Sequence, residues 1–160
     1  MLQNLTNKRI KSHILNLRRV CGFYLFCFSI ICIYRTFANI IALSYTEGKD
    51  DIILIKDKLE EVLDYSPSIM SKIETMKGID NSDEIIEHSD SLMLARGCLV
   101  LNIGISRLLY YQDLVLDKCK KRNCKLYIAS ELLSSLGKKE WPSRSDICDI
   151  SYIVKKVLKI

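Results

Sequence analysis

Residues 68–96 read SIMSKIETMKGIDNSDEIIEHSDSLMLAR and carry the pattern of one β–α–β unit. The runs at 68–74 (SIMSKIE) and 92–96 (LMLAR) are short, apolar and polar at one end, which is typical of buried strands. A short helix is predicted between them, over residues 81–88 or 82–88. Two strands joined through a helix lie parallel in one sheet, so this stretch predicts an α/β fold.

The same alternation continues on both sides of this unit. Short apolar runs at residues 39–45 (NIIALSY) and 125–130 (KLYIAS) predict two more buried parallel strands. Amphipathic patterns predict further helices over residues 51–63, over residues 107–122 and from Ser143 onward, where an acid three residues later predicts a capping box. The side chains expected to face the core are Ile52, Ile55, Leu59 and Val62, then Leu108, Tyr111, Val115 and Cys119, and finally Ile147, Ile150, Val154 and Val157.

Length and composition favour one domain and exclude some functions. At 160 residues, 49% of them hydrophobic, the chain can bury one core but is too short for two domains. Six Lys or Arg and no acid lie in residues 1–35, and the remainder is nearly neutral, so nucleic-acid binding is not expected. Seven cysteines without a CxxC pair argue against a disulfide framework or a zinc site and favour a reducing compartment.

The chain opens on a basic segment followed by an apolar run at residues 20–34 (VCGFYLFCFSIICIY). A membrane-spanning helix needs about 20 residues, so this run is short for a span, although it also resembles a signal peptide or anchor. We expect a helical apolar leader over residues 1–36, a folded domain over residues 37–160, and a cytoplasmic location. Membrane association through residues 20–34 is the alternative.

Functional groups of a parallel α/β barrel gather at the carboxyl ends of its strands. Lys72 and Glu74 lie two residues apart near such an end, so their side chains point to the same face of the strand. This pairing suits phosphoryl transfer, which needs a cation near the moving phosphoryl group and a hard oxygen ligand for Mg²⁺. Taken alone, the pair is also compatible with a solvated strand end.

Four segments follow one another in the order of the motifs of a known family. Residues 40–59 resemble FIAxSFxxxxxDVxxIRxxL, and residues 71–97 resemble a segment with a strand ending SKIEN and a later strand ending ARGDLG. Residues 118–136 resemble KCNxxGKPVIxATQMLESM, and residues 141–154 resemble RPTRAExxDVANAV. The chain thus resembles the pyruvate kinase family over residues of about 37–156. The resemblance implies a partial TIM-type (β/α)8 barrel of about four parallel βα units.

The resemblance also implies an activity and roles for residues. The family is a phosphotransferase of glycolysis that converts phosphoenolpyruvate and ADP to pyruvate and ATP with Mg²⁺ and K⁺. Lys72 falls on the catalytic lysine that binds the transferring phosphoryl group, and Glu74 falls on a Mg²⁺ ligand. Gly97 and Ser130 fall on substrate-binding positions, the first through its backbone N–H and the second through its hydroxyl.

Three residues depart from the family pattern. Cys98 stands at the position of the second Mg²⁺-binding aspartate, where a thiol is a poor ligand for a hard ion, so this metal ligand is expected to be lost. Cys98 could instead bind a softer metal or act as a nucleophile, but no His or second Cys lies near it in the sequence to support either role. Val100 replaces a glycine and would be strained at a positive φ. Glu131 replaces a glutamine and places a negative charge beside the phosphate site.

These departures predict a truncated and catalytically impaired form of the enzyme. The family's strands that carry the K⁺ ligands have no counterpart in this sequence, and about half of a barrel is matched. The alternatives are a non-catalytic pyruvate kinase remnant or binding module, and a small membrane-anchored protein. Two unpaired parallel strand edges also predict a homo-oligomer or association with full-length pyruvate kinase.

Overall fold

Four parallel strands alternate with helices and form a single sheet in the order β1-β2-β3-β4. The computed structural model describes residues 38–61 and 63–158. The strands are β1 (Ile40–Leu43), β2 (Ser68–Ile73), β3 (Ser91–Ala95) and β4 (Lys125–Ala129). The helices are α3 (Lys49–Glu60), α4 (Met76–Asp80), α5 (Ser82–His88), α6 (Arg96–Ile103), α7 (Leu108–Lys121) and α8 (Arg144–Leu158), with short 3-10 turns η1 (Ile105–Arg107) and η2 (Ser134–Gly137). The four predicted strands are confirmed, and the arrangement is a partial α/β barrel.

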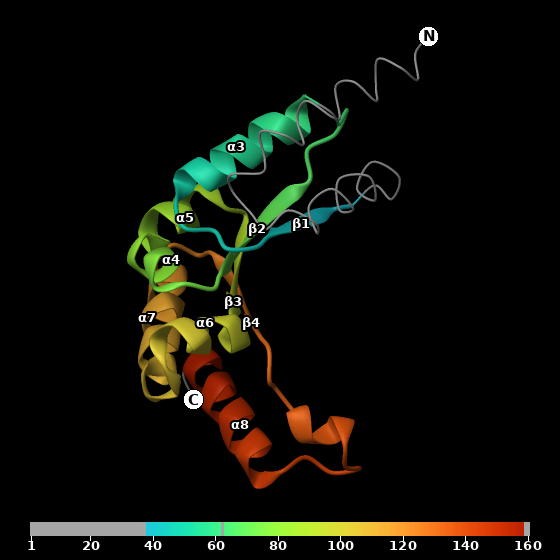
Figure 1. The fold of residues 1–160 in the computed structure, drawn as a ribbon, viewed down its shortest axis with the longest axis vertical. Coiled ribbons are helices and arrows are strands. Elements are labelled where there is room, and N and C mark those ends of the chain that lie inside the picture. The colour runs from blue at the N-terminus through green and yellow to red at the C-terminus, as the bar shows by residue number, and fades with distance from the viewer. Residues whose placement is uncertain (1–37, 62, 159–160) are drawn as a thin grey trace.

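Helices α3, α5 and α7 lie on one face of the sheet (Figure 1). The core forms between this face and the helices, because alternate strand residues such as Ile69 and Ile73 point toward them. Burying each aliphatic side chain there stabilises the fold by about 1.5–3 kcal/mol. The predicted inner positions of α3 and α7 that are buried are Ile52, Ile55, Leu59, Leu108, Val115 and Cys119, while Tyr111 packs against the core from its margin. Val62 lies outside the described residues.

Two helices were not expected from the sequence. Helix α4 begins at the N-cap Thr75, whose Oγ1 accepts a hydrogen bond from the Gly78 N–H at 3.1 Å. Helix α6 begins directly after β3 and contains Val100. Val100 is not among the residues of positive φ, so the strain expected at this position is not found.

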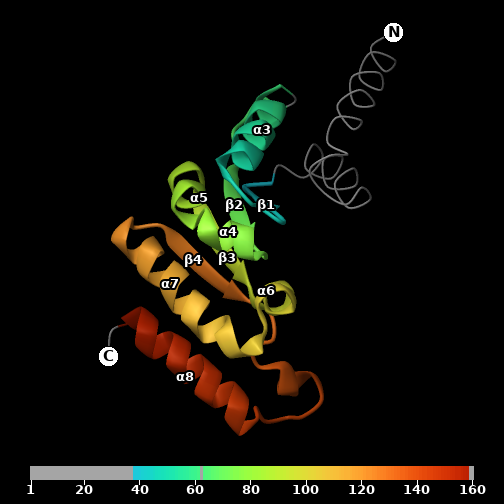
Figure 2. The same ribbon diagram turned by 60° about the vertical axis from the view of Figure 1, so that its left-hand side comes forward.

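Helix α8 starts as predicted but turns a different face toward the core. Its capping box is formed, because the Ser143 N–H donates to Asp146 Oδ2 at 3.0 Å and the Asp146 N–H donates to Ser143 Oγ at 3.2 Å. The helix runs beside α7 (Figure 2) and meets it through polar groups, with Tyr152 Oη donating to Asp113 at 2.6 Å. The prediction that its apolar stripe is buried was therefore wrong for Ile147, Val154 and Val157, which are 49%, 43% and 47% exposed.

The expected leader at residues 1–36, including the apolar run at 20–34, lies outside the described residues. Within the part of the chain that the structure does describe, no helix combines the length and apolarity needed to cross a membrane.

Glycine at position 78 is required by a close approach of two backbones. A Cβ built on Gly78 would lie 2.7 Å from the Thr46 carbonyl oxygen, a distance that a real Cβ does not adopt. We expect Gly78→Ala to lower the free energy of unfolding by about 1–3 kcal/mol, because the segment after β1 must move. Urea denaturation measures the change. Gly137→Ala is the matched control, since a Cβ there meets nothing within 4 Å; equal effects of the two variants would contradict the steric explanation.

Candidate active site at the carboxyl edge of the sheet

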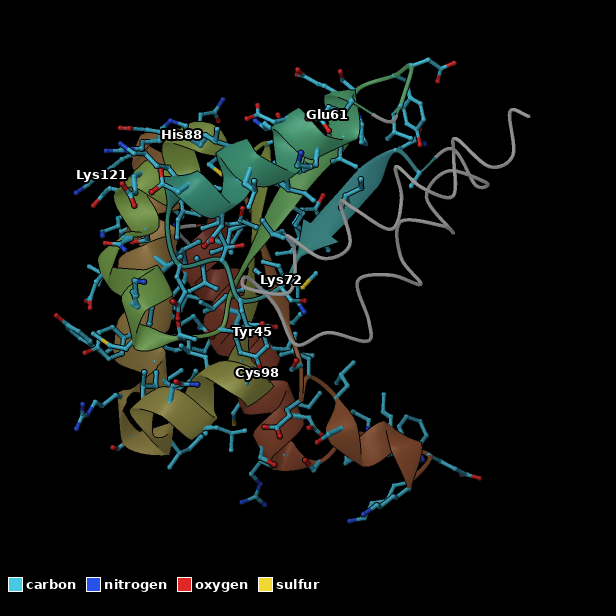
Figure 3. The ribbon with its side chains drawn as sticks, turned by 45° about the horizontal axis from the view of Figure 1, so that its top comes forward. Tyr45, Glu61, Lys72, His88, Cys98 and Lys121 are labelled. Carbon is cyan, nitrogen blue, oxygen red and sulfur yellow. The ribbon has the colours of Figure 1, made fainter. Side chains whose placement is uncertain are left out.

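The carboxyl ends of the first three strands bring a set of polar side chains together. Tyr45 follows β1, Lys72 and Glu74 lie at the end of β2, and Cys98 lies in the first turn of α6 after β3. Figure 3 shows Tyr45, Lys72 and Cys98 gathered at one end of the sheet. Parallel strands place all their carboxyl ends at the same edge, which is why residues distant in the sequence meet here.

Lys72 and Glu74 form the centre of this cluster. Lys72 Nζ forms an ion pair with Glu74 Oε1 at 2.8 Å and donates a hydrogen bond to Ser44 Oγ at 3.0 Å. Glu74 is only 2% exposed, and its other oxygen, Oε2, accepts the Tyr45 N–H at 2.9 Å. A carboxylate can be buried to this degree because its charge is paired and hydrogen-bonded. The shared face expected from the spacing of Lys72 and Glu74 is thus present in the structure.

Tyr45 was not singled out by the sequence, although it ends the first predicted strand. Its backbone has φ 52°, a left-handed conformation that no residue pattern indicated. The pKa of its phenol is raised, first by the electrostatic effect of the neighbouring Cys98 side chain and then by the carboxylate of Glu74. Tyr45 is 51% exposed, so solvent reaches its side chain.

The ends of β3 and β4 meet at Gly97 and Ser130. A Cβ built on Gly97 would lie 3.4 Å from Ser130 Cβ and 3.7 Å from its Oγ, so the Gly97 backbone and the Ser130 side chain are adjacent. Ser130 and Glu131 both have positive φ, 76° and 58°. Such conformations cost about 1–3 kcal/mol each and are concentrated at functional sites. Both residues are exposed, which leaves them open to a ligand.

Asn102 ties the start of α6 to the end of β2. Its Nδ2 donates to the Glu74 carbonyl oxygen at 3.2 Å and to the Cys98 carbonyl oxygen at 3.3 Å. The backbones of Glu74 and Cys98 are therefore held close together. This is the relation expected of two positions that would share one metal ion.

The residues present do not fit a Mg²⁺ ion. Glu74 Oε1 is ion-paired with Lys72 and Oε2 accepts a hydrogen bond, so both oxygens are engaged, and the Lys72 ammonium would repel a dication. The neighbouring positions offer the Cys98 thiol and the Tyr45 phenol, whereas Mg²⁺ prefers carboxylate and other hard oxygen ligands. Among the described residues, no group of three or more His, Cys, Asp or Glu could hold a metal ion.

A buried ion pair anchors α8 beneath the end of β3. Arg96 is 4% exposed, and its Nη1 and Nη2 donate to the two carboxylate oxygens of Asp149 at 2.8 Å and 2.6 Å. Arg96 directly precedes Gly97, so the pair also fixes the backbone that lies against Ser130. No local sequence pattern indicates this contact, because its partners are 53 positions apart.

Comparison with known proteins agrees with the geometry. Residues 30–156 match the family model for the pyruvate kinase barrel domain. The pyruvate kinase of Clostridium acetobutylicum is 32% identical over 113 residues, which cover 71% of this chain and 24% of that protein. The pyruvate kinase of Dictyostelium discoideum is 32% identical over 116 residues, covering 72% of this chain and 23% of that protein.

A solved structure shows the same fold. A pyruvate kinase from Cryptosporidium parvum superposes with a TM-score of 0.74 at 28% sequence identity, covering 78% of this chain and 26% of that one. The chain thus spans about a quarter of the length of the relatives that it matches. With the family model covering most of its residues and four parallel βα units in place, the chain belongs to the pyruvate kinase family.

Proposed function

We propose that this chain carries a pyruvate kinase-type phosphotransferase site whose conversion of phosphoenolpyruvate and ADP to pyruvate and ATP is severely impaired. The observation that carries the proposal is the composition of the cluster at the carboxyl edge. It keeps the cation Lys72 but holds one buried, fully engaged carboxylate, Glu74, beside the thiol of Cys98. A cytoplasmic location accompanies this function.

The retained groups suit a phosphorylated acid. Lys72 is partly exposed, with 23% of its side chain accessible, so its charge can face a phosphoryl group while Glu74 stays buried behind it. The adjoining Gly97 and Ser130 offer a backbone N–H and a hydroxyl as further donors. Lys72 is therefore the proposed catalytic residue, and Gly97 and Ser130 are the proposed substrate-binding residues.

The impairment follows from the metal ligands. The family's chemistry depends on Mg²⁺ and K⁺, and Glu74 occupies the position of one Mg²⁺ ligand while Cys98 occupies the other. Loss of even an outer partner of a metal ligand costs about 10–100-fold in affinity or activity. We infer a loss of at least that size here, because a direct oxygen ligand is replaced by sulfur.

A second candidate function, a non-catalytic binding module, is favoured by the open face of the sheet. Tyr127 is in register with Met93 and Lys72, so its side chain lies on the same face as the proposed site, and it is 42% exposed. Ile40, on the edge strand β1, is 50% exposed. Such a surface could seat a second copy of the chain or a full-length pyruvate kinase subunit.

An assay on the full chain tests the proposal. We expect folded protein supplied with phosphoenolpyruvate, ADP, Mg²⁺ and K⁺ to form pyruvate at least about 100-fold more slowly than an intact pyruvate kinase. Calorimetry should detect phosphoenolpyruvate binding that Lys72→Met weakens. Lys125→Met should leave this binding unchanged, because Lys125 is the first residue of β4 and lies at the end of the strand away from the proposed site.

Each result separates the candidates. A normal rate would contradict the impairment, and equal binding by both lysine variants would contradict the site. Binding without turnover, together with a shift to larger species when an intact pyruvate kinase is added during gel filtration, would favour the binding module.

A further inference from the structure

Helix α7 ends in a hydrogen-bonded turn that joins it to β4. Asn123 has φ 53°, and its N–H donates to the Lys120 carbonyl oxygen at 3.3 Å. The Cys124 N–H donates to the Cys119 carbonyl oxygen at 2.9 Å. These two bonds around a left-handed residue form a Schellman motif, in which the side chains at its two ends commonly pack against each other. Here the two ends are Cys119 and Cys124.

The contact that this motif creates is therefore between two thiols. The two thiols lie close enough for each to influence the pKa of the other, and the Cys124 thiol donates a weak hydrogen bond to the Lys125 carbonyl oxygen at 3.7 Å. Cys119 is only 1% exposed, whereas Cys124 is half-buried. Burial, helped by the neighbouring Cys124, raises the pKa of Cys119 to about 12, and burial also raises the pKa of Cys124. Both groups are thus protonated at neutral pH, and Cys124 is the one that a reagent in solvent can reach.

A metal is a poor occupant of this pair. In the part of the chain that the structure describes, no further His, Cys, Asp or Glu joins the two thiols to make a group that could hold a metal ion.

Formation of a disulfide needs only two sulfur atoms and backbones that allow them to meet. A disulfide requires Cα atoms roughly 4.4–6.8 Å apart, and the 2.9 Å hydrogen bond between Cys124 and Cys119 already holds the two backbones together.

We propose that Cys119 and Cys124 form a reversible disulfide within the chain by exchange with a small-molecule disulfide such as oxidised glutathione. Cys124 loses its proton to solvent and attacks one sulfur of the reagent, which forms a mixed disulfide and releases one glutathione thiolate. Cys119 then attacks the Cys124 sulfur and forms the new S–S bond; the bond between Cys124 and glutathione breaks, and the Cys119 proton passes to the departing sulfur, which leaves as the second glutathione thiol. Two protein thiols are oxidised, and one glutathione disulfide is reduced to two thiols.

Oxidation would fix the end of α7 to the start of β4. The other end of β4 leads directly to Ser130, so the cross-link braces the strand that carries one of the proposed substrate-binding residues. Because the exchange consumes one oxidised glutathione and releases two reduced ones, the ratio of linked to reduced protein should vary with the concentration of oxidised glutathione divided by the square of that of reduced glutathione.

Redox titration of the full chain tests the proposal. The folded protein is equilibrated with mixtures of reduced and oxidised glutathione, quenched with acid, alkylated and mapped by mass spectrometry of its peptides. We expect a linked Cys119–Cys124 species with an equilibrium constant against glutathione in roughly the millimolar range or above, because the second step is intramolecular. In the urea-unfolded chain the constant should fall at least about tenfold, since the turn no longer aligns the thiols.

Two variants identify the pair. Cys124→Ser should abolish the linked species, whereas Cys148→Ser, which removes an exposed thiol on α8, should leave it unchanged. Glutathione attached to Cys124 without a link to Cys119 would overturn the proposal. The same constant for the folded and unfolded chain would also overturn it, because the native turn would then contribute nothing.

Discussion

Replacing Asp149 by alanine is expected to lower the free energy of unfolding by about 3–5 kcal/mol. Asp149 accepts two hydrogen bonds from Arg96, at 2.8 Å and 2.6 Å, and the Arg96 side chain is 5% exposed. Without the carboxylate, the guanidinium remains buried with a weak bond to Gln112 Oε1 at 3.4 Å as its other side-chain contact in the described residues. Burying an unpaired charge is costly, and urea denaturation followed by circular dichroism measures the loss.

Two further variants show whether burial causes the effect. Asp83 pairs with Lys118 at 2.9 Å, but its side chain is 52% exposed, so Asp83→Ala should cost no more than about 1 kcal/mol. The double variant Arg96→Met with Asp149→Leu should recover most of the stability lost in Asp149→Ala, because apolar side chains can replace a buried ion pair. If Asp149→Ala and Asp83→Ala cost the same free energy of unfolding, the Arg96–Asp149 pair does not anchor α8.

The same ion pair explains why the buried face of α8 could not be predicted from the sequence. Local patterns were sufficient for the four strands and for α3 and α7, because those elements bury side chains at a regular spacing against one core. The apolar stripe of α8 has the same spacing, and its burial was predicted for the same reason. What turns that stripe outward is contact through Asp113 and Asp149, and the partners of these acids lie on other elements. An amphipathic pattern shows that a helix has an apolar face, but it does not show which element that face packs against.

Part of the candidate site could be predicted from the sequence, and part could not. The spacing of Lys72 and Glu74 predicted a shared face, and the parallel topology placed Gly97 beside Ser130. Tyr45 was missed, because it reaches the cluster through a left-handed turn at φ 52° that its residue type does not favour. The expectation of backbone strain at Val100 was also wrong, because the chain continues from β3 into helix α6 and not into a loop that needs glycine.

Replacing Cys98 by aspartate is expected to raise the affinity for Mg²⁺ by roughly 10–100-fold. The new carboxylate would lie in the first turn of α6, close to Glu74. Asn102 Nδ2 holds the two backbones together, because it donates to the carbonyl oxygens of Glu74 at 3.2 Å and of residue 98 at 3.3 Å. Two hard oxygen donors would then face one volume, and a second negative charge would offset the repulsion from Lys72. Calorimetric titration with Mg²⁺ alone measures the change without requiring turnover.

The control for this variant adds the same charge elsewhere. Cys148 is exposed on α8, so Cys148→Asp should leave Mg²⁺ affinity unchanged, and an equal gain in both variants would show that only net charge matters. Cys98→Asn separates the oxygen from the charge and should give a smaller gain than Cys98→Asp. If Cys98→Asp also gains Mg²⁺-dependent pyruvate formation, position 98 is the principal defect of the site. Tighter Mg²⁺ binding without turnover would place the remaining defect outside position 98, with the charge of Glu131 beside Ser130 as the next residue to change.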